Sequence, residues 1–328
     1  MPRPLLRTIA ACAVLLLALA GCSSGGGGEQ AAPSGAEAPA GAFPVTLQHA
    51  FGSTTIPQQP QRVVAIGYNE ADFVMALGVQ PVAERQVIGD FPFQQRPWLP
   101  QPPLGPTPEV LDASNLPIEQ IAALQPDLIL GVYSFIDRGT YDALSKIAPT
   151  VAQPTEDGTN ASTWDVQTRV TGQALGRTEQ ADEVIAATQQ KFDEAKQQHP
   201  DFAGKKLSMA FYVEGEPYNL GTDDLRAQLF AGLGFQVRAD SPTLSLEQQG
   251  QLDNDVIVVI GRTKAEAMAD PVFAAIPAVR EGRVAFLPAF GSEFGGALGY
   301  SSPLSLPYAI DTVNPLLDGA LKGEAPGT

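Results

Sequence analysis

The chain has 328 residues, of which 36 are acidic and 20 are basic, so its formal net charge at pH 7 is −16. This charge repels phosphate groups and therefore argues against nucleic acid and anionic lipid surfaces as partners. The length suffices for one large or two smaller domains, and the two cysteines, Cys12 and Cys22, exclude a disulfide-rich scaffold.

Residues 1–22 have the pattern of a secretory signal. Arg3 and Arg7 precede an apolar run over 9–20, and Leu19-Ala20-Gly21 leads directly into Cys22. The run is shorter than the roughly 20 residues that a membrane-spanning helix needs. The pattern resembles a bacterial lipoprotein signal, so we expect Cys22 to be the lipidated first residue of the mature protein. The alternative is a plain secreted protein in which Cys22 is incidental.

Residues 23–42 predict a flexible tether, because they are mainly Gly, Ala, Pro, Ser and Glu without apolar periodicity. Removal of Arg3 and Arg7 with the signal leaves 18 of the 20 basic residues against 36 acidic ones, a formal charge of −18. One cysteine then remains, so an internal disulfide is excluded. The folded part should therefore be stabilised by packing alone.

Residues 43–160 are expected to form an N-terminal α/β lobe. A strand over 62–66, a helix over 71–77 and a strand starting at 79 form the first βαβ unit. Residues 86–115 are rich in proline, glutamine and aromatics and predict a long loop. The rest of the lobe is predicted as a helix over 117–124, a strand over 127–132, a loop over 133–138 and a helix ending near 148.

Residues 161–200 show helical spacing with an interruption near Gly176, which predicts a helical connector that permits only small closure between lobes. Residues 201–328 restart the α/β pattern as a C-terminal lobe. The elements expected there are a strand over 206–213, a loop to 221, a helix over 223–233, strands over 235–237 and 283–287, a Gly- and Phe-rich loop over 290–300 and a helix over 305–321.

Two segments, 116–130 and 244–258, repeat one pattern 128 residues apart. Each has a Glu-Gln pair, a later aspartate and a final apolar run, which predicts a helix, a tight turn and a buried parallel strand. Identical residues stand at Leu116/Leu244, Glu119/Glu247, Gln120/Gln248, Leu124/Leu252, Asp127/Asp255 and Ile129/Ile257. The repeat indicates two Rossmann-like α/β lobes with mainly parallel sheets, joined by the long helical connector. Ligands of such lobes bind at the loops after the strands, here 67–70, 133–138, 214–226, 262–264 and 288–300.

The chain resembles the binding lipoproteins of iron–siderophore ABC importers, a group that also includes haem and vitamin B12 binders. The resemblance covers roughly residues 44–321 and is carried most specifically by the segments 62–82, 118–131 and 302–308. It implies a class III periplasmic binding protein fold and a monomer anchored to the outer face of a bacterial membrane. The implied function is to capture a ferric siderophore and deliver it to permease and ATPase subunits, without a resident cofactor or metal.

The resemblance also implies that Glu119 and Glu247, one on each lobe, dock onto arginines of the permease. Two carboxylates displayed at matching positions suit a two-fold partner and would fix its orientation. The alternative is that both glutamates merely favour the helix dipole.

A ferric siderophore site needs fixed positive charge and aromatic surface. Arg226 matches an arginine of catecholate-type binders, and Arg262 matches an arginine at the tip of the next strand, although either could be a surface residue or a structural ion pair. A third arginine of that group has no counterpart at 132–134, and the candidates to take its place are Arg138 and Arg96. Aromatic residues at or near the predicted cleft loops are Tyr68, Tyr133, Trp98, Trp164, Tyr212 and Tyr218, with Tyr68 and Tyr133 preferred because both directly follow N-lobe strands. If loop 290–300 faces the cleft, its aromatic residues Phe290, Phe294 and Tyr300 line the C-lobe wall.

Three alternatives remain open at this point. Haem is the second candidate ligand, with Tyr68 or Tyr133 as axial ligand, and cobalamin is the third. A lipoprotein enzyme of the same fold is the main alternative class. However, His49 and His199 are the only histidines, and the motifs of zinc hydrolases and serine hydrolases are absent from the sequence. The same scarcity of histidine argues against free zinc or manganese as cargo.

Overall fold

The computed structural model describes residues 42–86, 91, 93–155, 162–213 and 215–327. The predicted signal, Cys22 and the tether up to residue 41 lie outside the described residues. Within the described part, no helix is both long enough and apolar enough to cross a membrane.

The N-terminal lobe is built on a five-stranded sheet with every neighbouring pair parallel, in the order β5-β4-β3-β6-β7. Its central strands β3 and β6 are fully buried apolar runs, which is what helices on both faces of a parallel sheet require. The strands are β3 (Val63–Ala65), β4 (Ala83–Arg85), β5 (Glu109–Leu111), β6 (Leu128–Leu130) and β7 (Thr150–Val151). The helices are α1 (Glu70–Ala76), α2 (Ile118–Ala123), α3 (Arg138–Leu144) and the 3-10 turn η1 (Phe93–Gln95). An antiparallel hairpin, β1 (Val45–His49) and β2 (Gly52–Ile56), precedes them.

The C-terminal lobe repeats this plan with parallel strands in the order β10-β8-β11-β12, and β9 adds to β8 in the antiparallel direction. The strands are β8 (Lys206–Val213), β9 (Glu216–Leu220), β10 (Gln236–Val237), β11 (Val256–Ile260) and β12 (Val284–Phe286). The helices are α6 (Leu225–Gly232), α7 (Lys264–Ala269), α8 (Pro271–Ala274), α9 (Pro277–Arg280), α10 (Glu293–Tyr300), α11 (Ser305–Leu321) and the 3-10 segments η2 (Pro200–Phe202) and η3 (Leu246–Leu252). The lobe has an apolar core on each face of its sheet.

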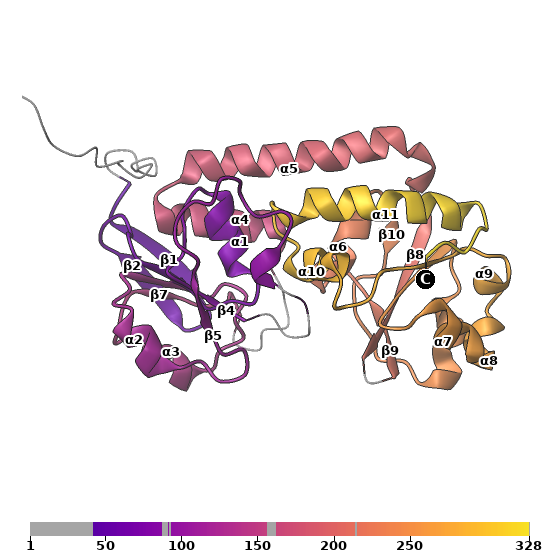
Figure 1. The fold of residues 1–328 in the computed structure, drawn as a ribbon, viewed down its shortest axis with the longest axis horizontal. Helices are drawn as coiled ribbons and strands as arrows, with labels where there is room; N and C mark the ends of the chain where they lie inside the picture. Colours follow the sequence, from indigo (N-terminus) through magenta and orange to yellow (C-terminus); the bar gives the residue numbers. More distant parts are fainter. Residues whose placement is uncertain (1–41, 87–90, 92, 156–161, 214, 328) are drawn as a thin grey trace, which may run out of the picture. The chain divides into compact units, whose positions relative to one another are not determined.

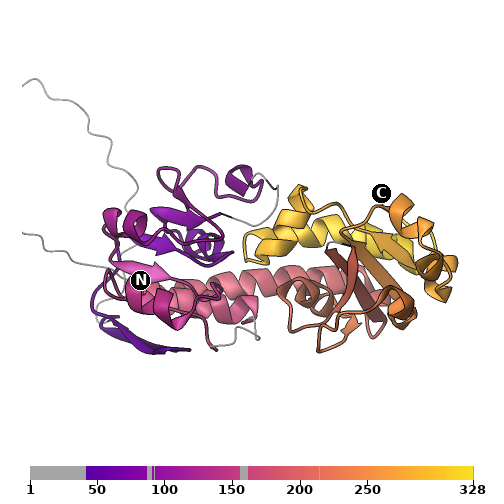
Figure 2. The same cartoon turned by 90° about the horizontal axis from the view of Figure 1, so that it is seen from below.

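Between the lobes, the chain forms the helices α4 (Trp164–Leu175) and α5 (Thr178–Gln198), with Gly176 between them in the left-handed conformation at φ 67°. Helix α4 packs against α1 and β1 of the N-terminal lobe, whereas α5 packs against both α4 and α11 (Figure 1, Figure 2). The interruption predicted at Gly176 is therefore a helix end that reverses the chain. Helix α5 thus runs from α4 on the N-terminal lobe to α11 of the C-terminal lobe.

The repeat seen in the sequence is confirmed in the structure. Strand β6 pairs with β3, and β11 pairs with β8, in parallel at equivalent places in the two sheets. Asp127 accepts hydrogen bonds of 2.8 Å from the backbone N–H groups of Gln61 and Arg62, and Asp255 accepts one of 2.8 Å from Lys206. Each aspartate thus ties its turn to the start of the neighbouring strand, which gives a physical reason for the residue in both copies.

Four predicted segments differ from the structure. The strand expected from residue 79 begins at Ala83, because Pro81 has no N–H to give to the sheet. The expected loops over 86–115 and 214–221 contain the strands β5 and β9. The Gly-rich segment expected as a loop over 290–300 contains helix α10, which Ser292 caps by accepting from the N–H of Gly295. A side chain at Gly296 would lie 2.5 Å from the ring of Phe91, so this glycine serves close packing rather than a turn.

Candidate functional site

A cavity of about 400 Å³ lies where the loops after β3 and β6 face the start of α6 and the end of α10. Loops at the carboxyl ends of parallel strands are the usual ligand sites of such sheets. The lining residues are Tyr68, Tyr133 and Phe135 from the N-terminal lobe and Leu225, Arg226, Gly299 and Tyr300 from the C-terminal lobe. Of the residues singled out in the sequence, the structure therefore brings together Tyr68, Tyr133, Arg226 and Tyr300.

The N-lobe wall of this cavity is a cluster of three aromatic rings. The centroid of Tyr133 lies 4.7 Å from that of Phe135 and 6.5 Å from that of Tyr68, in edge-to-face geometry. Phe135 has a φ of 52° and is 46% exposed, although it is a large apolar residue. The backbone turn thus holds an apolar ring at the cavity surface, where a ligand can cover it.

Glu70 holds the two aromatic loops together from behind. Its buried carboxylate accepts hydrogen bonds from the N–H groups of Val132 at 2.9 Å and Tyr133 at 3.2 Å. A side chain at Gly67 would lie 1.7 Å from Oε2 of Glu70, so only glycine leaves room for the carboxylate. The N–H of Tyr68 donates to the carbonyl of Tyr133 at 3.0 Å, which completes the link between the loops. Glu70 is therefore a positioning residue of the site.

Stability should depend on pH through Glu70. Burial raises its pKa to about 7, against the opposing effect of the N–H groups of Tyr133 and Val132. Because the folded-state pKa lies above the unfolded value, the stabilisation is complete below the unfolded value and is lost as the pH rises through about 7. Between pH 5 and pH 8, the free energy of unfolding of Glu70→Gln should rise by on the order of 2–3 kcal/mol relative to that of the unmodified chain, because glutamine does not ionise. Urea unfolding of both proteins at the two pH values measures this, and parallel pH profiles would contradict it.

Arg85 supports the same wall and was missed in the sequence. Its guanidinium lies 4.0 Å from the ring centroid of Tyr68 and donates to the carbonyls of Ser134 at 2.9 Å and Ala113 at 2.5 Å. These acceptors belong to loops after different strands, so one buried cation joins several loops through their main chains. The signal in the sequence was the pair Glu84-Arg85 directly after an apolar run, since charged residues in a buried strand rarely lack a partner.

The C-lobe wall carries Arg226 at the start of α6. Its Nε and Nη2 atoms donate to the two carboxylate oxygens of Asp224 at 2.8 and 2.5 Å, and its guanidinium lies 4.0 Å from the ring centroid of Phe211. Asp224 also caps α6 by accepting from the N–H of Arg226 at 2.9 Å. Burial raises the pKa of the facing Tyr133 to about 12, and the carboxylate of Asp224 acts in the same direction. Tyr133 is thus a neutral hydroxyl in the cavity at physiological pH.

Arg262 lines a second cavity of about 330 Å³ at the ends of β11 and β12, together with Thr263, Glu266 and Phe290. The guanidinium lies 4.1 Å from the ring centroid of Tyr212, and its Nη1 atom is 3.4 Å from Oδ2 of Asp270. The ring of Phe290 meets that of Phe211 at 5.0 Å, and Phe211 in turn lies beneath Arg226. This aromatic pair therefore connects the lining of the second cavity with Arg226 of the first.

Three predicted ligand residues lie in packed environments. Tyr212 is 2% exposed beneath Arg262, and its hydroxyl donates to Gln249 at 2.6 Å. Trp98 stacks on Phe91 at 5.8 Å, and Trp164 stacks on Phe192 at 6.2 Å within the connector. None of the three is among the described residues that line the first cavity.

The other sequence candidates for this region are dispersed. Phe294 is buried in the C-lobe core, whereas Tyr300 lines the first cavity. Arg138, considered as a substitute for the third arginine, lies over the rings of Phe51 and Tyr141. Arg96, the other substitute, is buried in the ion-pair cluster described next.

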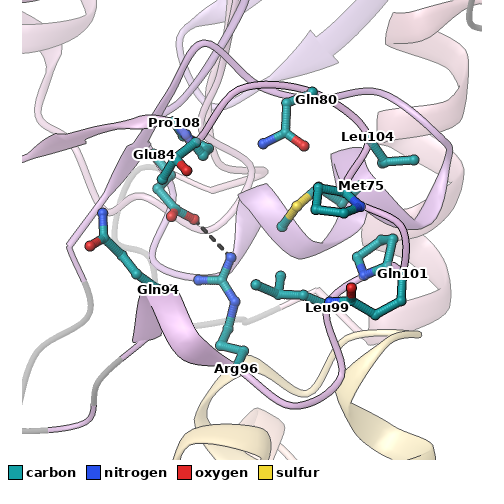
Figure 3. Close-up of a pocket in the computed structure, with 13 residues that line it drawn as sticks. Met75, Gln80, Glu84, Gln94, Arg96, Leu99, Gln101, Leu104 and Pro108 are labelled. Atoms are coloured by element: carbon teal, nitrogen blue, oxygen red, sulfur yellow. Dashed lines mark hydrogen bonds and ion pairs between the residues drawn. The ribbon is translucent and has the colours of Figure 1, made fainter. Parts of the chain in front are cut away.

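A buried ion-pair cluster joins the lobes beside the first cavity. Arg96 lies 3.2 Å from Asp72 and 3.0 Å from Glu84, and it donates to the Tyr300 hydroxyl at 2.6 Å. The hydroxyl of Ser302 in the C-terminal lobe donates to Asp72 at 2.8 Å. Burial raises the pKa values of Asp72 and Glu84, and Arg96 opposes this. Figure 3 shows the Glu84–Arg96 pair at the side of a further cavity of about 220 Å³, whose wall includes apolar side chains of the loop after η1.

The two repeated glutamates are exposed and lie in the first turns of α2 and η3. Neither is among the described residues that line the two cavities. Groups of three or more His, Cys, Asp or Glu side chains suited to hold a metal ion were not found in the described part of the chain.

Solved binding proteins share this fold. A periplasmic solute binding protein from Mycobacterium smegmatis is 34% identical, with a TM-score of 0.74 and coverage of 84% of this chain and 98% of that one. PiaA of Streptococcus pneumoniae in complex with ferrichrome is 27% identical, with a TM-score of 0.76 and coverage of 85% and 99%. The class III fold expected from the sequence is therefore confirmed.

A curated relative and a family model agree with the fold. The probable siderophore-binding lipoprotein YfiY of Bacillus subtilis is 28% identical over 210 residues, and the match spans 63% of this chain but only 61% of YfiY. The family model described as "Periplasmic binding protein" matches residues 63–289, which include the lining of both cavities except Phe290, Gly291, Gly299 and Tyr300. Both the family and the solved neighbours are binding proteins. The chain thus belongs to the periplasmic binding protein family.

Proposed function

We propose that this chain is the extracytoplasmic substrate-binding component of an ABC importer and captures a ferric siderophore between its lobes. The observation that carries this proposal is the cavity of about 400 Å³ with three aromatic rings on one wall and Arg226 on the other. Binding sites of this size are typically concave and mainly apolar, with a few polar groups that fix orientation. The names of YfiY and of the PiaA–ferrichrome complex support the same class of cargo.

The geometry suggests how the cargo is held. Tyr68, Tyr133 and Phe135 offer flat apolar surface for the organic part of a chelate, and the Tyr133 hydroxyl offers a hydrogen-bond donor. Arg226 approaches from the other lobe, so the ligand contacts both lobes at once. Because the buried Arg96 cluster and helix α5 already join the lobes, we expect only a small movement on binding.

The proposed context follows from the remaining residues. Cys22 carries the lipid that anchors the protein to the outer face of the membrane, and residues 23–42 act as the tether. Glu119 and Glu247 dock onto the permease, whose ATPase subunits drive uptake. The protein acts as a monomer and, with its strongly negative charge, has no nucleic-acid partner.

Equilibrium dialysis of the unlipidated mature chain against ferric siderophores, haem and cobalamin tests the proposal. We expect a Kd of about 1 μM or lower for at least one ferric siderophore and much weaker binding of its iron-free form. At a ligand concentration of about 100 Kd, binding should also stabilise the fold by about 2.7 kcal/mol. Binding of haem or cobalamin alone would identify a different cargo for the same class of importer. A failure of every tested compound to bind would refute the proposal.

A matched pair of variants locates the binding event. Phe135→Ala removes an exposed ring of the cavity wall and should weaken binding about tenfold, because one aromatic contact contributes about 1–1.5 kcal/mol. Met268→Ala removes an apolar side chain of similar exposure on α7 and should leave the Kd unchanged. Equal effects of the two substitutions would place the ligand elsewhere.

A further inference from the structure

Resting on the proposed function, we infer that the site selects a ferric tris-hydroxamate chelate of zero or positive net charge and discriminates against trianionic tris-catecholate and anionic carboxylate chelates. The inference rests on the charges that line the two cavities and on how each of them is paired.

The supply of positive charge to the cavities is limited. After residue 41 the sequence has 18 lysines and arginines, and among the described residues that line the two cavities the cations are Arg226 and Arg262. The internal residues outside the description, 87–90, 92, 156–161 and 214, include four acidic residues and no lysine or arginine. These stretches therefore have no further cation to contribute.

Both cavity arginines are already neutralised by a neighbouring carboxylate. Asp224 takes two hydrogen bonds from Arg226, and its side chain is 17% exposed. Asp270 pairs with Arg262, and its side chain is 16% exposed. Glu266, which caps α7 through Thr263, adds one more negative charge to the lining of the second cavity. Two positive charges thus face three negative ones.

The N-lobe side chains among the described residues that line the cavity are aromatic and carry no formal charge. Behind them, Arg85 donates to main-chain carbonyls and has Asp112 as an acidic neighbour, and Glu70 accepts from main-chain N–H groups. A chelate in the cavity therefore meets aromatic surface, a tyrosine hydroxyl and two internally compensated ion pairs.

The charge of the chelate follows from its ligand groups. Each hydroxamate carries one negative charge, so three of them neutralise Fe³⁺, and an additional amine makes the complex cationic. Each catecholate carries two negative charges, so three of them leave a charge of about −3 on the complex, which needs unpaired cations around it. An anionic chelate that approaches the remaining N–H groups of Arg226 also meets the carboxylate of Asp224, which holds the Nε and Nη2 atoms and is anchored there as the cap of α6.

A comparison of four chelates tests the inference. We expect ferrichrome, which is neutral, and ferrioxamine B, which is a cation, to bind about 100-fold more tightly than ferric enterobactin or ferric dicitrate. The Kd of ferrichrome should change little between low and high NaCl concentration, because no net charge is neutralised on binding. Tighter binding of enterobactin or dicitrate would overturn the inference but leave the proposed function intact. Failure of every chelate to bind would instead overturn the proposed function.

A single substitution should shift the preference. Asp224→Asn keeps a side chain that caps α6 but releases the charge of Arg226, so it should tighten ferric enterobactin about tenfold or more and leave ferrichrome nearly unchanged. Asp240→Asn is the matched control, because Asp240 pairs with Arg238 across the same two-residue spacing and neither lines the two cavities. Thermal unfolding of both variants verifies their folding. An unchanged ratio of the two affinities in folded Asp224→Asn would overturn the inference.

Discussion

Replacement of Arg96 by methionine is expected to lower the free energy of unfolding at pH 8 by about 3–5 kcal/mol. The side chains of Asp72 and Glu84 are 0% and 3% exposed, and Arg96 is the cation that lies between them. Methionine fills a similar volume but leaves both carboxylates without a positive partner in a buried place. The cost of an uncompensated buried charge, rather than the loss of an attraction, determines the size of this effect.

The pH dependence of this loss distinguishes it from a packing defect. Burial already raises the pKa values of Asp72 and Glu84, and removal of Arg96 takes away the main opposing effect. Carboxyl groups with raised folded-state pKa values stabilise the fold at low pH and lose that contribution as the pH rises. The deficit of the variant relative to the unmodified chain should therefore shrink between pH 8 and pH 5.

Urea unfolding at both pH values measures the effect, with Arg238→Met as the control. Arg238 forms an ion pair of 2.9 Å with Asp240, whose side chain is 73% exposed, so its loss should cost no more than about 1 kcal/mol at either pH. An Arg96→Met deficit as small as that of the control, or one that does not change with pH, would contradict the proposed burial of charge.

The elements predicted best are those whose pattern is local. Helix α11 spans Ser305–Leu321 and strand β8 spans Lys206–Val213, the bounds expected from the sequence. In both segments the apolar period and the flanking polar residues suffice to define the element. Strand β9 and helix α10 depend instead on distant partners, since β9 forms by pairing with β8 and the glycines of α10 make room for Phe91.

The candidate site shows the same division. Tyr68, Tyr133 and Arg226 could be predicted because each lies in or just after a loop at the carboxyl edge of a sheet. The packing of Trp98 and Trp164 could not be predicted, because each ring stacks on a residue from a different segment. Phe91 precedes η1 whereas Trp98 follows it, and Phe192 lies on α5 whereas Trp164 lies on α4. Glu70 and Arg85 were missed because their partners are main-chain groups. The pair Glu84-Arg85 after an apolar run signals buried charge but does not identify those partners.

The second large effect concerns delivery rather than capture. Reversal of both exposed glutamates, Glu119→Arg with Glu247→Arg, is expected to reduce ferric siderophore uptake by cells to the background level. The two residues occupy matching positions of the repeat, one in each lobe, and can meet a two-fold permease simultaneously. Complementary charges mainly steer the encounter and fix its orientation, and reversal replaces attraction with repulsion at both contacts.

Affinity for the chelate should stay unchanged in the same double variant, because neither glutamate is among the described residues that line the cavities. The matched control reverses Glu179 and Glu183, which are exposed on α5, and should leave uptake at the level of the unmodified protein. This control changes the net charge by the same amount, so a general electrostatic effect would lower uptake in both variants. Loss of affinity in the first variant would place Glu119 or Glu247 in the binding site, and normal uptake would leave them as residues that favour the helix dipole.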